Sequence, residues 1–213
     1  MPLKAEFIDI SVPLSDELPV WPGGYGFHRH QLMYISSGDD ANVTRLDYDV
    51  HSGTHIDAPH HFVEEGICTN EIPLTHFIGD CQVLDFTGLS IITAFDLDKK
   101  FISKDSKRIL LKTSNSTEEW FVKPFNKNFT AISKDAAEWL VTRGVKLIGI
   151  DGPSIQKYQD SKDTHVILLK NELIILEGLY LSGVTEGYYT LICLPVKAKA
   201  CEGISARAIL KYK

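Results

Sequence analysis

Short runs rich in β-branched and aromatic residues recur along the whole chain. Runs of this kind, bounded by glycine, proline or small polar residues, are typical of strands rather than helices. Six of them are predicted strands, at residues 7–11, 43–50, 81–86, 108–112, 190–196 and 205–211. Their spread over the chain predicts a substantial sheet.

One segment in the second half of the chain shows clear helical periodicity instead. It follows Ser133, a residue type that caps helix N-termini, and ends before Gly144, a residue type favoured just past helix C-termini. Its apolar positions keep the spacing of one helix face: Ala136, Ala137, Leu140 and Val141. A helix is therefore predicted between Ser133 and Gly144.

Strand-like and helical segments alternate beyond this helix. A buried-strand pattern at 145–150 ends in a turn at 151–154, a second helix is predicted over 163–170, and a short apolar strand at 173–176 leads into Glu177. The mixture predicts an α/β or α+β fold with a mixed, partly antiparallel sheet and flanking helices. No repeat or linker divides the sequence, so residues 1–213 are predicted to form a single compact domain.

Composition narrows the class of partner. Hydrophobic residues make up 44% and charged residues 23% of the chain, as in ordinary globular proteins. The formal charge of −6 comes without a cluster of lysine or arginine, which argues against binding to nucleic acid or to an anionic membrane. The expected partner is therefore a small-molecule substrate.

Two further features bear on the compartment. The N-terminal segment lacks the apolar core of a secretory signal, and no uncharged apolar run approaches the roughly 20 residues that span a bilayer. The four cysteines are scattered without a C-x-x-C pair, which suits reduced thiols better than disulfides or a zinc knuckle. We therefore expect a cytoplasmic protein.

Half of the histidines fall within one short segment. Of the eight in the chain, His51, His55, His60 and His61 lie between positions 51 and 61, together with Asp57. A single histidine is more often a structural or surface residue, but imidazoles beside a carboxylate form the usual ligand set of zinc or a similar divalent ion. Such a site keeps a position open for water, which indicates a metal-dependent hydrolase.

The spacing within this segment constrains its backbone. In a straight strand His51 and His55 would lie roughly 13 Å apart, too far to share one ion. Gly53 is well placed to bend the chain between them, whereas His55 and Asp57, two positions apart, share one face of a strand and can converge. A bend at Gly53 is therefore a requirement of the metal hypothesis.

Pro59 ends any regular strand and leaves two adjacent histidines on a loop. Because neighbouring side chains on a loop point in different directions, only one of His60 and His61 is expected to reach the metal site. An imidazole with an unperturbed pKa of about 6.5 suits both removal and return of a proton. We expect one of these two histidines to carry the protons without being required for metal binding.

Glu177 is a candidate ligand far from the histidine segment. It follows an apolar run, and no lysine or arginine occurs between it and Lys197, so a buried carboxylate here needs another positive partner, such as a metal ion. A glutamate at a strand end can equally face solvent. His165, in the first turn of a predicted helix, is by itself more typical of a structural residue than of a ligand.

The longest motif in the chain resembles a known family signature. The pattern His-x-Gly-Thr-His-x-Asp-x-Pro-x-His-Phe, at 51–62, looks like that of the putative cyclase family of metal-dependent hydrolases, which includes bacterial kynurenine formamidases and isatin hydrolases. The likeness extends to 8–14, 19–23, 144–154 and 176–179. It implies a swivelling β/β/α-like fold and a homodimer.

The resemblance also implies residue roles. Residues matching His51, His55 and Asp57 bind one metal, and Asp57 bridges to a second. The second site is completed by the residues matching His165 and Glu177. Two further roles concern the substrate: the residue matching His61 donates and accepts protons, and that matching Trp21 lines the substrate pocket.

Departures from the family pattern concern the substrate rather than the metals. The stretch 113–116 differs from the expected Thr-Gly, and 201–204 replaces a more usual Asp-Gly turn. The resemblance favours hydrolysis of N-formyl-L-kynurenine to L-kynurenine and formate. Opening of a cyclic amide such as isatin is the alternative, and a catalytically silent metal- or ligand-binding member is another. Two divalent ions per chain are expected, zinc or alternatively manganese.

Overall fold

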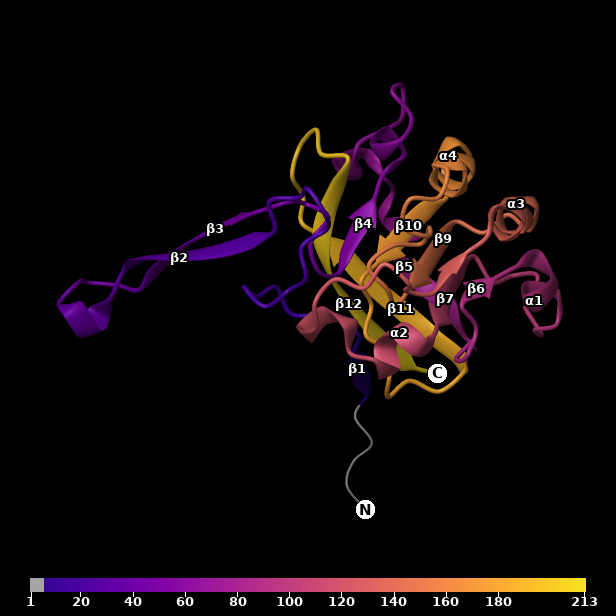
Figure 1. The fold of residues 1–213 in the computed structure, drawn as a ribbon, viewed down its shortest axis with the longest axis horizontal. Helices are drawn as coiled ribbons and strands as arrows, with labels where there is room; N and C mark the ends of the chain where they lie inside the picture. Colours follow the sequence, from indigo (N-terminus) through magenta and orange to yellow (C-terminus); the bar gives the residue numbers. More distant parts are fainter. Residues whose placement is uncertain (1–5) are drawn as a thin grey trace, which may run out of the picture.

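Seven strands form a closed barrel at the centre of the computed structural model, which describes residues 6–213 (Figure 1). Around the ring lie β12 (Gly203–Tyr212), β11 (Gly187–Pro195), β5 (Ile78–Asp85), β7 (Arg108–Lys112), β9 (Leu147–Ile150), β10 (Ile174–Glu177) and β4 (His55–Asp57). Pairing of β4 with β12 closes the barrel. An eighth strand, β1 (Phe7–Asp9), pairs with β12 outside the ring.

Strand direction in the barrel is mixed. β5, β7, β9 and β10 run parallel, and the remaining pairings are antiparallel. The chain segments that connect these parallel strands contain β6 (Ile91–Ile92), α1 (Ala94–Asp98), α2 (Ser114–Thr117), β8 (Ala131–Ile132), α3 (Lys134–Thr142) and α4 (Asp163–Lys170). The expected α/β fold with a mixed sheet is confirmed.

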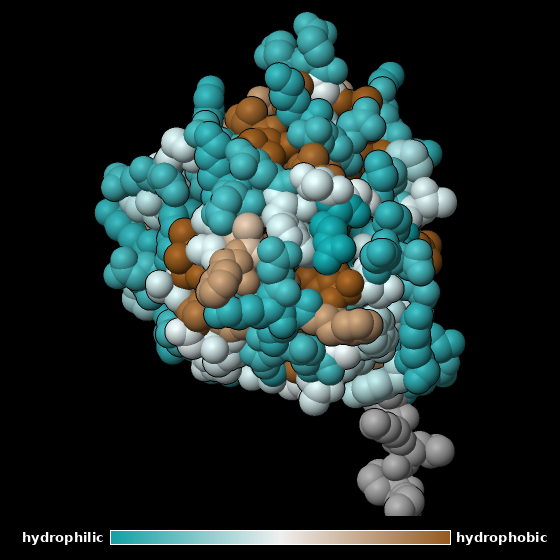
Figure 2. All heavy atoms as spheres, turned by 90° about the vertical axis from the view of Figure 1, so that its right-hand side faces the viewer, coloured by the Kyte–Doolittle hydropathy of each residue, from teal (hydrophilic) through white to brown (hydrophobic). Residues whose placement is uncertain are grey.

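Three of the helices cover one side of the barrel. In Figure 1, α1, α3 and α4 lie on its right-hand side, and Figure 2 shows this face from outside. Hydrophilic side chains dominate the surface there, with apolar patches scattered between them. This amphipathic character follows from the helical spacing of apolar residues, which turn toward the barrel.

The strands contribute side chains to two apolar clusters, one on each face of the sheet. One cluster takes residues from all seven strands, such as Leu110 and Leu176, and fills the barrel. The other takes their neighbours, such as Ile109 and Ile175, and packs them against the helices. Because successive side chains of a strand point to opposite faces, both faces of the parallel strands are buried, which explains their continuous apolar runs.

The elements expected from the sequence differ from the structure mainly at their ends. The helix 163–170 and the strand 108–112 have the predicted bounds, and α3 begins after Ser133. Gly144 follows α3 with a φ of 67°, a conformation that glycine adopts without strain. The other seven predicted strands begin or end one to three residues away, within the usual uncertainty of about two to four residues.

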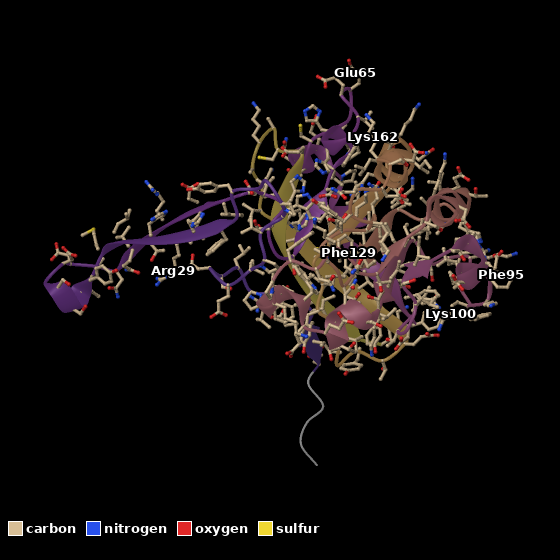
Figure 3. The ribbon with its side chains drawn as sticks, in the orientation of Figure 1. Arg29, Glu65, Phe95, Lys100, Phe129 and Lys162 are labelled. Atoms are coloured by element: carbon tan, nitrogen blue, oxygen red, sulfur yellow. The ribbon has the colours of Figure 1, made fainter. Side chains whose placement is uncertain are left out.

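A hairpin outside the barrel was not expected. β2 (Phe27–Met33) and β3 (Val43–Tyr48) pair antiparallel and project from the barrel as an arm, residues 27–48, with η1 (Ile35–Ser37) near its tip (Figure 1). Figure 3 shows Arg29 on the arm, clear of the barrel. The sequence predicted β3 but not its partner, because the mostly polar segment of β2 has no apolar alternation.

Short 3-10 turns complete the described elements: η2 (Pro59–His61), η3 (Thr69–Glu71), η4 (Leu74–His76) and η5 (Trp120–Val122). Within residues 6–213, no helix has both the length and the apolar character required to cross a membrane. The segment used above to exclude a secretory signal includes residues 1–5, which lie outside the described range.

Candidate metal centre and substrate pocket

A sharp bend at Gly53 brings the first two histidines together. Gly53 has a φ of 61°, and the rings of His51 and His55 lie 5.2 Å apart between centroids. Thr54 holds the bend against the end of β10, because its hydroxyl donates to the carbonyl of Gly178 over 2.6 Å. Gly178 must be glycine, since a Cβ there would lie 2.0 Å from the carbonyl oxygen of Gly53.

Strand pairing sets three acidic and imidazole side chains side by side. His55 and Asp57 flank Ile56, which points into the barrel, so both project from its outer face. In the antiparallel pairing of β4 with β10, Glu177 lies opposite His55. His55 Nε2 is 3.5 Å from both Asp57 Oδ1 and Glu177 Oε2.

The first turn of α4 adds His165 to this group. Its Nε2 lies 3.3 Å from Glu177 Oε1 and 3.7 Å from Asp57 Oδ2. The other ring nitrogen, Nδ1, lies 3.2 Å from the side-chain oxygen of Gln156, which can accept its proton and so leave Nε2 free to bind a metal. The structure thus brings together residues separated by more than a hundred positions.

The two adjacent histidines point in different directions. His61 stacks on His51, with 4.1 Å between ring centroids, and lines the cavity above the cluster. His60 turns away, and its Nδ1 lies 3.1 Å from the carbonyl oxygen of Glu64. His61 also lies close enough to His51 and Asp57 for one atom of each to contact the same ion.

The residues present fit divalent metal ions. Five side chains are candidate ligands, and we call them the metal-ligand cluster: His51, His55, Asp57, His165 and Glu177. His51 Nε2, His55 Nε2 and Asp57 Oδ2 are buried without a hydrogen-bond partner among the described residues. A tetrahedral ion bound at about 2.0–2.1 Å separates its ligand atoms by about 3.3 Å, close to the 3.3–3.7 Å between atoms of this cluster.

Electrostatics in the cluster favour added positive charge. Burial alone would raise the pKa of Asp57, but a hydrogen bond from His51 and the charges of nearby histidines hold it well below its usual range. Burial would lower the pKa of His55, yet the close approach of Glu177 and the negative charges of Asp57 and Glu177 raise this pKa to about 9. The two buried carboxylates therefore require cations beside them.

His61 has a different electrostatic character. Burial is the largest effect on this imidazole and lowers its pKa to about 4, with the charges of His51 and His165 acting in the same direction. The ring is therefore neutral at pH 7, with a pKa below the unperturbed value of about 6.5 expected from the sequence. It lies beside the cluster, where a reacting water molecule would be bound.

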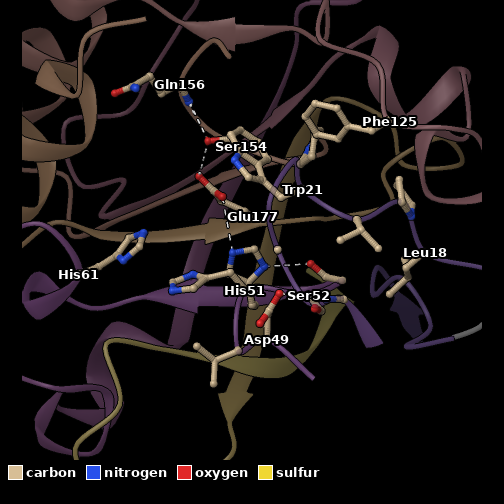
Figure 4. Close-up of a pocket in the computed structure, with 18 of the residues that line it drawn as sticks. Leu18, Trp21, Asp49, His51, Ser52, His61, Phe125, Ser154, Gln156 and Glu177 are labelled. Carbon is tan, nitrogen blue, oxygen red and sulfur yellow. Dashed lines mark hydrogen bonds and ion pairs between the residues drawn. The ribbon is translucent and has the colours of Figure 1, made fainter. Parts of the chain in front are cut away.

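A cavity of about 560 Å³ opens over the metal-ligand cluster (Figure 4). Trp21 and Phe125 line it, and Figure 4 shows both on the side of the cavity away from His61. Their rings meet edge to face with centroids 5.1 Å apart, and Phe129 and Tyr158 pack behind Trp21. We call these four residues the aromatic wall. Trp21 remains 42% exposed, so it borders the cavity rather than the core.

Comparisons with known proteins place the chain in a family. The model of the family described as "Putative cyclase" matches residues 8–157. The chain belongs to the putative cyclase family. Kynurenine formamidase from Erythrobacter litoralis (strain HTCC2594) is 38% identical over 208 residues, covering 95% of this chain and 92% of that protein.

Solved structures show the same fold. A potential metal-dependent hydrolase with cyclase activity superposes with a TM-score of 0.84 at 32% identity, over 97% of this chain and 98% of the other. Isatin hydrolase A from Ralstonia solanacearum gives a TM-score of 0.83 at 18% identity, over 97% and 92% of the two chains, and shows the fold alone. This member of the putative cyclase family is accordingly a hydrolase.

Several residues around the cluster were not expected from the sequence. The turn 151–154 was predicted, but not that Ser154 Oγ and the Ile155 N–H hydrogen-bond Glu177, over 3.3 and 2.6 Å. Nor was the contact of Gln156 with His165 expected. These residues carry no distinctive local pattern; their one signal is that they directly follow β9, at an edge where parallel strands place functional loops.

Gly203 is a further residue that the sequence did not single out. It pairs with Asp57 across β12 and β4. A Cβ at Gly203 would lie 2.4 Å from Cε1 of His51, so only glycine lets that ring lie over the strand. The neighbouring Glu202 places Oε1 3.5 Å from His51 Nε2. The departure from the family pattern at 201–204 therefore lies directly beside the metal-ligand cluster.

Proposed function

We propose that this chain is a metal-dependent amide hydrolase that converts N-formyl-L-kynurenine into L-kynurenine and formate. The observation that carries the proposal is the cavity, which has an imidazole and carboxylate cluster on one side and an aromatic wall on the other. A formamide attached to an aryl ring needs both features. The name of the Erythrobacter relative supports the choice of substrate.

The metal-ligand cluster divides into two overlapping groups. We assign His51, His55 and Asp57 to one ion and His165 and Glu177 to a second, with Asp57 shared between them. Zinc is the proposed metal and manganese the alternative, because imidazole suits zinc while carboxylate also binds manganese. When bound, the ions lower the pKa of a water molecule and polarise the amide carbonyl.

His61 is the proposed proton carrier. Its neutral ring accepts the proton released as water oxygen bonds to the formyl carbon, and it returns a proton to the aryl nitrogen as the C–N bond breaks. Formate and an aryl amine are then the products. Stacking on His51 holds the His61 imidazole beside the metal-ligand cluster.

The aromatic wall holds the rest of the substrate. Trp21 is proposed to stack on the aryl ring, while the edge contact with Phe125 keeps the indole in place. Such a contact contributes about 0.5–1.5 kcal/mol beyond the burial of area. The aromatic wall therefore determines which amides bind, and the metal-ligand cluster determines that the bound amide is hydrolysed.

Metal analysis combined with a two-substrate assay tests the proposal. Protein purified without added metal is analysed for its elements, reconstituted with zinc or manganese, and assayed with N-formyl-L-kynurenine and with isatin. We expect two ions per chain and release of formate. If only isatin is hydrolysed, the substrate is a cyclic amide and not a formamide. If metal binds but neither compound is hydrolysed, the chain is a catalytically silent member of the family.

We also propose that the chain forms a homodimer through the arm. A two-stranded ribbon without further support is marginally stable in water. Yet the arm exposes large apolar side chains, including Leu32, Ile35 and Leu46, each at least 50% exposed. Covering them with a second copy of the same surface gives the simplest closed symmetry, a two-fold axis.

Sedimentation tests the dimer. At micromolar concentration we expect a mass near twice the 23.9 kDa of one chain. Leu46→Asp should shift the protein toward monomer, because a charge at a buried interface position is costly. Leu74→Asp is the matched control, since Leu74 is also exposed but lies on η4. A wild-type mass near that of one chain contradicts the proposal.

A further inference from the structure

One loop, residues 151–158, connects the metal-ligand cluster to the aromatic wall. Ser154 and Ile155 hydrogen-bond Glu177, and Gln156 contacts His165. The next residue, Lys157, reaches the other side and donates to the backbone carbonyl of Phe129, a member of the aromatic wall. Figure 4 shows Ser154 and Gln156 above Glu177.

Lys157 has no carboxylate partner within ion-pair distance among residues 6–213. Its ammonium group donates to the carbonyl oxygens of Asn128, over 3.4 Å, and Phe129, and lies 6.0 Å from the Phe129 ring centroid. Burial lowers its pKa, and no acidic neighbour offsets this effect. By contrast, Lys100 and Lys112 each lie within ion-pair distance of a carboxylate.

The other charged groups at the cavity already have partners. Asp49 Oδ2 accepts the backbone N–H groups of Tyr25 and Gly26, over 2.6 and 2.9 Å, and Glu202 lies 3.5 Å from His51. Lys157 is the only lysine or arginine among the described residues that line the cavity. A half-buried cation without an anion, at the edge of a binding cavity, is typical of a site for an anionic group of a ligand.

We propose that Lys157 binds a carboxylate on the side chain of the aryl substrate, which makes it a specificity-determining residue for acidic aryl amides. The inference rests on the proposed function and extends it. With the amide at the metal-ligand cluster and the ring against Trp21, a substituent of the ring would occupy the same cavity that Lys157 lines. Formylkynurenine carries such a carboxylate, whereas isatin has none.

A matched pair of substrates tests this role. N-formylkynurenine and N-formylkynuramine differ only in the carboxylate, so the ratio of their kcat/KM values measures its recognition. In Lys157→Met this ratio should fall about tenfold, the size expected for a charge-assisted contact partly weakened by solvent. Lys157→Arg should restore most of the ratio because it keeps the cation.

Lys127→Met is the control for a general effect of lost charge. Lys127 is exposed, packs over the Tyr158 ring at 5.0 Å, and does not line the cavity. In Lys127→Met, the ratio of the kcat/KM values for the two substrates should match that of the wild type. An unchanged ratio in Lys157→Met, or an equal fall in Lys127→Met, would overturn the proposal. A purely structural role would lower kcat/KM for both substrates alike and leave the ratio unchanged.

Product binding separates this inference from the proposed function. If metal-loaded wild type hydrolyses neither formamide, the proposed reaction fails, but the affinities of kynurenine and kynuramine still report the contact. We expect Lys157→Met to reduce the preference for kynurenine about tenfold. An equal preference in variant and wild type would show that Lys157 does not bind the carboxylate.

Discussion

On one side of the cavity, His55, Asp57 and Glu177 sit on paired strands and are at most 4% exposed; on the other, Trp21 is 42% exposed and belongs to no strand or helix. These three members of the metal-ligand cluster are positioned by backbone hydrogen bonds of the barrel, whereas the aromatic wall is held by contacts between rings. Changes to the cluster should therefore alter metal binding and turnover together. Changes to the wall should alter substrate affinity.

Removal of a buried ligand should produce the largest effect. His55→Asn deletes a nitrogen that faces both carboxylates, so we expect the protein to lose metal and its activity to fall by more than about 10³-fold. Elemental analysis and kcat/KM measured on the same preparation check this. His76→Asn, at a partly buried histidine outside the cavity, is the control and should retain both. Full metal content in His55→Asn would remove this residue from the ligand set.

Loss of the proton carrier should affect turnover without emptying the site. His61→Asn should lower kcat by about 10² to 10⁴, the usual contribution of general acid and base catalysis, with near-normal metal content. His60→Asn is the control, because that side chain contacts the backbone of Glu64 instead. If His61→Asn also lost metal, His61 would be a ligand; if His60→Asn were the impaired variant, the two roles would be reversed.

The aromatic wall should give the smallest effect and the opposite kinetic signature. Trp21→Ala should raise KM about two- to tenfold, the equivalent of 0.5–1.5 kcal/mol of lost stacking, and should change kcat and the melting temperature little. Phe101→Ala, at a side chain that is 82% exposed and outside the cavity, is the control. A large fall in melting temperature with unchanged kinetics would instead make Trp21 a core residue.

The difference between the metal-ligand cluster and the aromatic wall also explains which site residues could be predicted from the sequence. His51, His55 and Asp57 lie within seven positions, and strand alternation and the bend at Gly53 follow from local rules. The strands and helices that support these residues were predicted from the spacing of their apolar residues. His165 and Glu177 entered mainly through the family resemblance, because their convergence depends on the pairing of β4 with β10 and on the packing of α4.

The wall and the arm were harder to predict for physical reasons. Phe125, Phe129 and Tyr158 lie outside strands and helices, so no periodic spacing links them to Trp21. The arm contributes almost nothing to the apolar core, and a strand without a buried face lacks the alternation that marks strands in sequence. Lys157 gave no signal at all, because the absence of a charge partner is a property of three-dimensional surroundings.

The ligand-bearing strand β4 has one more consequence, which concerns the lifetime of the protein. β4 is three residues long and is the element that closes the barrel between β10 and β12. Ions bound by His55 and Asp57, as we propose, would therefore also stabilise the pairing of β4 that closes the barrel. Since a ligand that binds only the folded state stabilises it by mass action, metal supply in the cell would govern how long the folded protein persists as well as how fast it works.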